Sequence, residues 1–254
     1  MEPILKVCNL TKVFSRAGQE DFTAVNSIIF SLNPGECLGI IGESGSGKTT
    51  AVNMITRLQD ATSGSIVLDG KDITHLKGKE LRKVYRKMQM VFQTPTDSFD
   101  PRRTLGDGIG ESLRNIGMSR KETREEVERL LGKCGLPADF ADRYPHQVSG
   151  GQCQRAAIAR ALAVKPRLLI CDEATSALDV TVQKEILELL NELRSQQGNS
   201  LSILFICHDI SLVQQFCDRV LVMYHGSIVE EGIPNEVIGH PKDAYTQRLI
   251  DSVL

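Results

Sequence analysis

The chain has 254 residues and a net charge of −2, because 30 Lys and Arg balance 32 Asp and Glu, and 41% of its residues are hydrophobic. This composition excludes a disordered or fibrous protein, and the balanced charge argues against nucleic acid as a partner. The seven cysteines form no C-x-x-C pair and no histidine lies at zinc spacing, which argues against a disulfide framework or structural metal and favours a reducing compartment. The first residues lack a signal-peptide pattern and the longest apolar runs are strand-sized, so we expect neither export nor a membrane span.

The N-terminal part predicts short β-strands, each rich in Val, Ile or Leu and bounded by Asn, Gly or Pro. These strands cover residues 4–10, 27–32 and 37–41. The middle of the chain predicts an α-rich insert instead. A basic run from Lys77 to Lys87 reads as an amphipathic helix with a solvated charged face rather than a nucleic-acid patch. Its apolar positions are Leu81, Val84 and Met88.

A second helix of this insert is predicted over 120–131, because Ser119 and Glu122 form a capping box at its start. A helix of small residues follows from Gln154 to about residue 163. Strands and helices then alternate, with strands at 168–171, 201–207, 220–224 and 227–230 and helices at 180–194 and 210–216. Such alternation predicts a mostly parallel sheet covered by helices, with a hairpin joining the last two strands.

The first chemical motif fits G-x-x-x-x-G-K-[ST] and stands between a predicted strand and a predicted helix, which is the context that a phosphate-binding loop requires. Its residues are Gly42, Glu43, Ser44, Gly45, Ser46, Gly47, Lys48 and Thr49, with Thr50 following. Glycines let the backbone curl so that consecutive N–H groups face phosphate oxygens at a helix N-terminus. Lys48 is predicted to contact the β- and γ-phosphates and Thr49 to bind Mg²⁺.

The second motif is the apolar strand that ends in Asp172 and Glu173. On its own, an Asp-Glu pair after a strand would indicate only a solvated acidic turn. Downstream of a phosphate-binding loop, an Asp at the end of a strand can hold the magnesium through water and the next Glu can polarise an attacking water.

The third motif follows Val148 and precedes the predicted helix from Gln154, 23 residues before Asp172. It consists of Ser149, Gly150, Gly151 and Gln152. With this motif the chain resembles the ABC-type ATPases over nearly its whole length. The resemblance implies a Q-loop glutamine at Gln93, with a catalytic and metal-binding role. It also implies a switch histidine at His208, which would contact the γ-phosphate and the attacking water rather than a metal. It also implies a D-loop over residues 176–179 ending in Asp179, and an adenine-stacking role for Phe14. Cys153 departs from the Arg usual after this motif, and the departure leaves Ser149 and Gly151 intact.

Three segments resemble the importers of the dipeptide, oligopeptide and nickel class: residues 93–102, 144–147 and 240–247. Many peptide-importer ATPases continue into a cysteine-containing extension, and this sequence stops at Leu254, which favours the shorter nickel or metal-chelate type.

The resemblance implies an α/β fold of the P-loop NTPase type, with a RecA-like core, an antiparallel β subdomain and an α-helical insert. One ABC ATPase domain is expected over 1–254, its core at about 1–93 and 156–254 and its insert at 94–155. The implied function is ATP hydrolysis with Mg²⁺ that energises import of peptides or nickel chelates through a separate permease at the cytoplasmic face of the membrane. The alternative is a soluble ABC-type ATPase of an enzyme complex such as carbon–phosphorus lyase.

The expected partners are the permease, indirectly a substrate-binding protein, and a second ATPase subunit, homologous or identical. The last follows from two phosphate-suited helix ends in one chain, at the P-loop and at Ser149. The family implies that ATP is sandwiched between the P-loop of one subunit and Ser149, Gly151 and Gln152 of the other.

Overall fold

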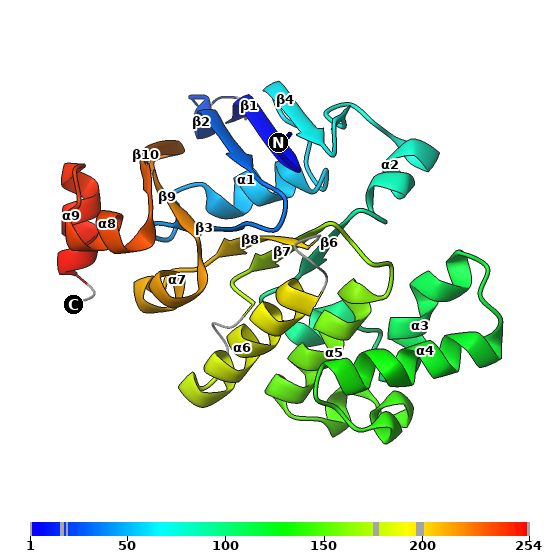
Figure 1. Cartoon of the computed structure of the whole chain (residues 1–254). Coiled ribbons are helices and arrows are strands. Elements are labelled where there is room, and N and C mark those ends of the chain that lie inside the picture. The colour runs from blue at the N-terminus through cyan, green and yellow to red at the C-terminus, as the bar shows by residue number, and fades with distance from the viewer. Residues whose placement is uncertain (1, 16–17, 19, 175–177, 197–200, 253–254) are drawn as a thin grey trace.

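The computed structural model describes residues 2–15, 18, 20–174, 178–196 and 201–252. Within them the strands form two sheets (Figure 1). The larger sheet has the order β10-β9-β3-β8-β7-β6, in which β9 to β6 are parallel and β10 pairs antiparallel to β9. Its strands are β10 (Ser227–Gly232), β9 (Arg219–Tyr224), β3 (Cys37–Ile41), β8 (Ser202–Ile206), β7 (Leu168–Asp172) and β6 (Met88–Val91).

The smaller sheet is antiparallel, with the order β2-β1-β4-β5. Its strands are β2 (Phe22–Leu32), β1 (Leu5–Phe14), β4 (Ser63–Leu68) and β5 (Lys71–Asp72). Helix α1 (Lys48–Ile55) lies between the two sheets, and its buried apolar side chains belong to one cluster with side chains from both sheets (Figure 1).

The parallel strands are buried on both faces, because alternate side chains enter different apolar clusters. Leu38 and Ile40 of β3 face the cluster around α1, whereas Cys37 and Ile41 face the other cluster. That second cluster includes α5 (Gly150–Leu162), α6 (Val180–Gln196) and α7 (Ile210–Phe216), together with α3 (Leu105–Asn115) and α4 (Arg120–Lys133). The sheet thus separates the α1 side of the molecule from the helical side.

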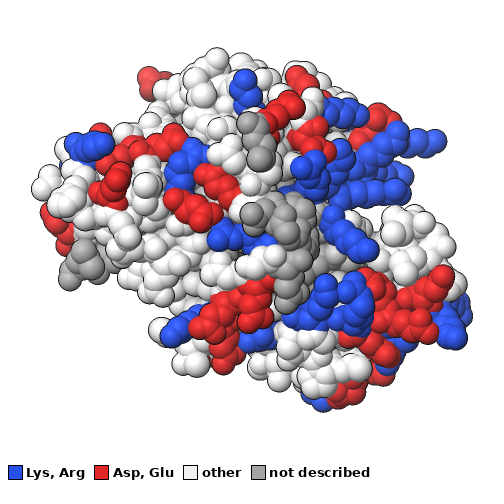
Figure 2. Space-filling view, in the orientation of Figure 1, with Lys and Arg blue, Asp and Glu red and all other residues white. Residues whose placement is uncertain are grey.

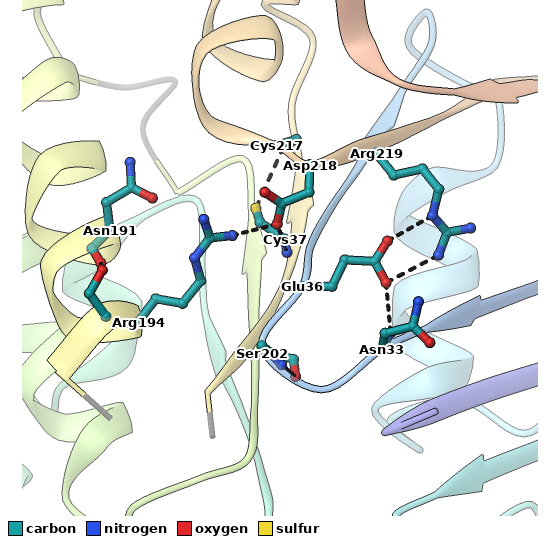
Figure 3. A network of polar contacts seen from close by, with 11 residues as sticks. Asn33, Glu36, Cys37, Asn191, Arg194, Ser202, Cys217, Asp218 and Arg219 are labelled. Atoms are coloured by element: carbon teal, nitrogen blue, oxygen red, sulfur yellow. Dashed lines mark hydrogen bonds and ion pairs between the residues drawn. The ribbon is translucent and has the colours of Figure 1, made fainter. Parts of the chain in front are cut away.

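The start of β3 is held by a polar network, which Figure 3 shows. The Cys37 N–H donates to Asp218 Oδ2 at 2.8 Å, and Arg194 of α6 donates to the same oxygen at 2.7 Å. The Glu36 carboxylate accepts from Arg219 Nε of β9 at 2.7 Å. Since β3 leads directly into the glycine-rich loop, this network fixes the base from which the loop departs.

The structure corrects one predicted helix. Helix α2 (Gly78–Val84) ends before Met88, which instead begins β6 and pairs with Leu168. Val84 and Met88 are buried in the same cluster, so the four-residue spacing looked helical although a helix and a strand each contribute one residue.

The small-residue helix also begins earlier than predicted, at Gly150 rather than Gln154, because Ser149 caps it. The insert was predicted to end at residue 155, which lies inside this helix, α5. The division of the chain into core and insert remains a prediction. The predicted elements omitted β4, β5, α3, α8 (Pro234–Gly239) and α9 (Ala244–Asp251), and three short 3₁₀ turns: η1 (Pro95–Ser98), η2 (Ala138–Asp142) and η3 (Pro145–Gln147).

Basic side chains gather over α2 on the face shown in Figure 2, while acidic and basic residues are interspersed elsewhere on that face. The exposed basic residues of this segment are Lys77, Lys79, Arg82, Lys83, Arg86 and Lys87. Among the described residues, none of the helices combines the length and the apolar character that crossing a membrane requires.

Candidate nucleotide-binding and catalytic site

The glycine-rich loop curls between β3 and α1 in a form that only glycine permits at two positions. Gly42 has φ 148°, and a Cβ there would lie 2.2 Å from the backbone oxygen of Met223. Gly47 has φ 105°, and its Cβ would lie 2.4 Å from the backbone oxygen of Ala24. Side chains are thus excluded by both backbone angle and space, and the loop keeps the curl that turns N–H groups toward one centre.

Lys48 lies inside this curl. Its side chain is buried, and Nζ donates to the carbonyl oxygens of Gly42 at 2.7 Å and Glu43 at 2.8 Å. Burial lowers the pKa of Lys48, while the nearby charges of Glu173 and Asp172 oppose that shift. The ammonium is therefore held by two carbonyl dipoles, near enough to the two acids at the end of β7 to interact with their charges.

Asp172 ends β7 and is buried, and its Oδ1 has no hydrogen-bond partner among the described residues. Burial, and then the charge of Glu173, raise the pKa of Asp172 to about 6, against the lowering effect of Lys48. A buried carboxylate oxygen without a donor is suited to a divalent cation or to a water bound to it. The residues present therefore fit a Mg²⁺ ion at this sheet edge.

Glu173 adopts a left-handed backbone conformation with φ 47°, which is strained for a residue with a Cβ. Its N–H donates to the carbonyl oxygen of Ile206 at 3.0 Å, so the neighbouring strand β8 holds the strained residue in place. Strain that is held by surrounding structure is typical of functional positions.

A cavity of about 270 Å³ brings most of these groups together. It is lined by Phe22, Ala24, Ser44, Gly45, Gly47, Lys48, Thr49, Thr50 and Glu173. The cavity thus joins the P-loop to the predicted catalytic carboxylate.

Phe22 is a residue that the sequence interpretation missed. Phe14, the predicted adenine-stacking residue, is the cross-strand partner of Phe22 in the β1–β2 hairpin but does not line the cavity. Phe22 is 63% exposed and Phe14 is 37% exposed. The exposed aromatic at the start of β2 could be seen in the sequence, but its place beside the P-loop depends on the hairpin register.

Gln93 and His208 follow the two strands that flank β7. Gln93 comes after β6 and His208 after β8, and both strands run parallel to β7, so the three strands end at the same edge of the sheet. Both side chains are exposed. The topology therefore brings the predicted Q-loop and switch residues to the edge that carries Asp172 and Glu173.

The signature motif forms the start of α5. Ser149 Oγ accepts from the Gln152 N–H at 3.3 Å, and Gln152 Oε1 accepts from the Ser149 N–H at 3.0 Å, which is a complete capping box. Gly151 lies so close to α6 that a Cβ would come within 2.6 Å of Val182. Within the described part of the chain, residues 149–152 do not line the cavity at the P-loop. Nucleotide contact by Ser149, Gly150, Gly151 and Gln152 remains a prediction.

The side chain of Cys153 points into the helical core and is 1% exposed, and burial raises its pKa to about 11. A buried thiol fills space in the core, so this position does not present a side chain to a phosphate.

Of the predicted D-loop, Ser176 and Ala177 lie outside the described residues. Asp179 is exposed, and its Oδ1 accepts from the N–H of Val182 at 3.0 Å at the start of α6.

A parallel sheet that presents a P-loop, a strand-end acidic pair and a second capped glycine helix defines an ATPase of the ABC type. The family model "ABC transporter" matches residues 25–176, and the chain belongs to this family. The predicted α/β fold class, with its antiparallel β subdomain and helical insert, is confirmed, and the protein is an ATPase that uses ATP with Mg²⁺.

The chain is similar to proteins named as peptide transport subunits. It is 46% identical to the oligopeptide transport ATP-binding protein OppF of Escherichia coli K12, over 91% of this chain and 69% of OppF. It is 45% identical to the oligopeptide transport ATP-binding protein AppF of Bacillus subtilis, over 99% of this chain and 78% of AppF. Among solved structures, a dimeric post-hydrolysis state of the ATP-binding cassette MJ0796 bound to ADP and Pi has a TM-score of 0.82 and 32% identity, covering 91% of this chain and 98% of that one.

Proposed function

We propose that this chain is the ATP-hydrolysing subunit of a peptide importer, bound to a separate permease at the cytoplasmic face of the membrane. The observation that carries this proposal is the similarity of nearly the whole of this chain to parts of OppF and AppF, both named as oligopeptide transport ATP-binding proteins. The complete set of ATPase motifs supports it, because a subunit of this kind must hydrolyse ATP itself. A nickel chelate as cargo remains a prediction.

In the proposed mechanism the curled loop binds the ATP phosphates with its N–H groups. Lys48 gives up its hydrogen bonds to the carbonyls of Gly42 and Glu43 and donates to the β- and γ-phosphates instead. Its positive charge then interacts with an anion and no longer with backbone dipoles. Thr49 and Asp172 would hold Mg²⁺, with help from Gln93. When bound, the ion neutralises charge on the phosphate oxygens.

Glu173 is the proposed general base. It would accept a proton from a water whose oxygen bonds to the γ-phosphorus while the bond to the β–γ bridging oxygen breaks, leaving ADP and phosphate. His208 would contact the γ-phosphate and orient that water. Glu173, held at the strained turn after β7, lines the same cavity as Lys48, which supports this role.

The second candidate is an ATPase subunit of an enzyme complex such as carbon–phosphorus lyase. Both candidates hydrolyse ATP at the same site, so they differ in their partners. The names of the relatives favour the importer.

The test is reconstitution with the permease and binding-protein subunits of an oligopeptide importer, in proteoliposomes with ATP enclosed. We expect ATP-dependent uptake of a labelled tripeptide, and no uptake when the ATPase carries Glu173→Gln, which serves as the matched control because it keeps the shape of the side chain. Uptake of nickel chloride or of a nickel chelate instead of the peptide would reassign the cargo. Stable assembly with lyase subunits, without stimulation by a permease, would overturn the importer proposal.

A further inference from the structure

The C-terminal helix α9 reaches back to the P-loop through one tyrosine. The N–H of Glu43, at the start of the loop, donates to the phenolic oxygen of Tyr245 at 3.0 Å. The two residues are 202 positions apart in the sequence, and Tyr245 is 4% exposed. The segment 240–247 thus has a direct contact with the nucleotide-binding loop.

Tyr245 is held in this position from two sides. Its ring stacks on that of Tyr224 at the end of β9, with 3.9 Å between ring centroids and 23° between planes. The backbone before α9 is fixed to β10, because the Glu230 carboxylate accepts from the N–H groups of Lys242 at 3.0 Å and Asp243 at 3.1 Å. Asp243 in turn caps α9 by accepting from the Tyr245 N–H at 2.8 Å. The phenol therefore has little freedom to leave the loop.

The contact matters because of which peptide group it holds. The Glu43 N–H and the Gly42 carbonyl belong to the same planar peptide unit. That carbonyl accepts from Lys48 Nζ at 2.7 Å, so one peptide is bound by Tyr245 on its nitrogen side and by the P-loop lysine on its oxygen side. Because the peptide is planar, holding the Glu43 N–H sets the direction of the Gly42 carbonyl. That carbonyl in turn sets the position of the Lys48 ammonium in the nucleotide-free protein.

We propose that Tyr245 is a positioning residue for ATP binding, which orients the Gly42–Glu43 peptide and thereby pre-organises Lys48 in the P-loop. Tyr245 touches neither nucleotide nor metal in this proposal and acts through the backbone. Without the Tyr245 hydroxyl, the Gly42–Glu43 peptide can rotate. Part of the binding free energy of ATP is then spent on ordering this peptide. The result is weaker nucleotide binding at an unchanged chemical step.

The test compares Tyr245→Phe with Tyr224→Phe. The first removes the hydroxyl that accepts from the loop and keeps the stacked ring, and the second removes a hydroxyl from the other ring of the same stack. For Tyr245→Phe we expect a KM for ATP and a Kd for ADP raised about three- to tenfold, the range for losing one hydrogen bond, with kcat within about twofold of wild type. For Tyr224→Phe we expect wild-type constants.

Hydrogen exchange gives a second readout that does not depend on turnover. In the nucleotide-free protein the Glu43 amide should exchange faster in Tyr245→Phe than in wild type, while amides of β3 keep their protection. Unchanged KM and Kd in Tyr245→Phe would overturn the proposal. A fall in kcat alone, or equal effects of the two substitutions, would also overturn it, because either result would show that the stack or the general fold, and not the hydroxyl, is responsible.

Discussion

The carboxylate of Asp172 is buried, has one oxygen without a hydrogen-bond partner among the residues that the structure describes, and lies beside another acid; each of these disfavours its charged form. Its pKa in the fold is about 6 against an ordinary value of 3.8. Ionisation is therefore more costly in the folded than in the unfolded chain. As pH rises from about 4 to about 6, this carboxyl therefore lowers the free energy of unfolding progressively. Above about pH 6 its destabilising contribution is constant.

We therefore expect Asp172→Asn to stabilise the nucleotide-free protein above about pH 6 by about 1–3 kcal/mol, and by less at pH 5. Thermal unfolding in EDTA between pH 5 and pH 8 measures the effect. A stability difference that does not change with pH would show that charge on Asp172 is not its cause. The same variant should lose Mg²⁺-dependent ATPase activity, since the amide lacks the charge that a cation needs.

Lys48 and Glu173 should give different kinetic phenotypes although they line one cavity. Lys48→Ala removes charge-assisted hydrogen bonds to phosphate and should weaken ATP binding about 10- to 100-fold. Glu173→Gln keeps the binding groups and removes the base, so turnover should fall about 10²–10⁴-fold at near-normal affinity. Equilibrium binding and phosphate release measured on both variants test this. Wild-type turnover in Glu173→Gln would remove Glu173 from the mechanism.

At the scale of elements, the network at the base of β3 should contribute to stability more than the surface ion pairs do. Glu36 and Arg219 are mostly buried, with side-chain exposures of 11% and 22%, and Arg219 also contacts Glu231. Arg219→Met removes the two donors that Arg219 gives to the Glu36 carboxylate, Nε at 2.7 Å and Nη2 at 3.3 Å, and should cost about 1–3 kcal/mol of unfolding free energy.

Arg102→Met is the matched control for this prediction, because Arg102 is 88% exposed in its pair with Asp100 and that pair should contribute less than about 1 kcal/mol. Chemical denaturation of both variants gives the comparison. Equal losses would mean that the network at β3 adds nothing beyond an exposed ion pair.

The sequence predicted the elements whose signals are local. Strand β3 and the loop after it need only an apolar run and fixed glycines, and the strand was predicted with its observed bounds. Helix α3 was missed because Gly106, Gly108 and Gly110 give it a poor helix propensity. Packing explains these glycines: a Cβ at Gly106 would lie 2.6 Å from the Ala141 oxygen, and one at Gly108 would lie 2.6 Å from the Phe99 ring.

The site shows the same division. Motif residues such as Lys48 could be assigned from spacing, whereas Phe22 reaches the cavity through the register of a hairpin and Tyr245 reaches Glu43 across most of the chain. Such contacts depend on tertiary structure, and no local pattern encodes them.

At the scale of the whole molecule, the described part of one chain supplies an incomplete site. The cavity at the P-loop is lined by the loop, the start of β2 and Glu173, while the capped N-terminus of α5 at Ser149 contributes no lining residue. The N-termini of α1 and α5 both suit phosphate, but only that of α1 lies at the P-loop. This is explained if ATP lies between two subunits arranged head to tail. The cassette MJ0796, which shares this fold, is named as dimeric and bound to ADP and Pi.

The dimer should therefore require both nucleotide and an intact signature. In the Glu173→Gln background, ATP and Mg²⁺ should double the mass measured by light scattering, or should do so only with the homologous partner subunit if the pair is a heterodimer. Adding Ser149→Arg places a bulky cation at the proposed interface and should abolish this shift and, in the wild-type background, reduce ATP turnover at least tenfold.

Ser119→Arg is the control, because Ser119 caps α4 with the same capping box and lies outside the signature. It removes a cap of the same kind and should leave the dimer intact, so a loss specific to Ser149→Arg reports on the interface and not on helix stability. Dimer formation and turnover that survive Ser149→Arg would show that the signature does not act on the nucleotide of a neighbouring subunit.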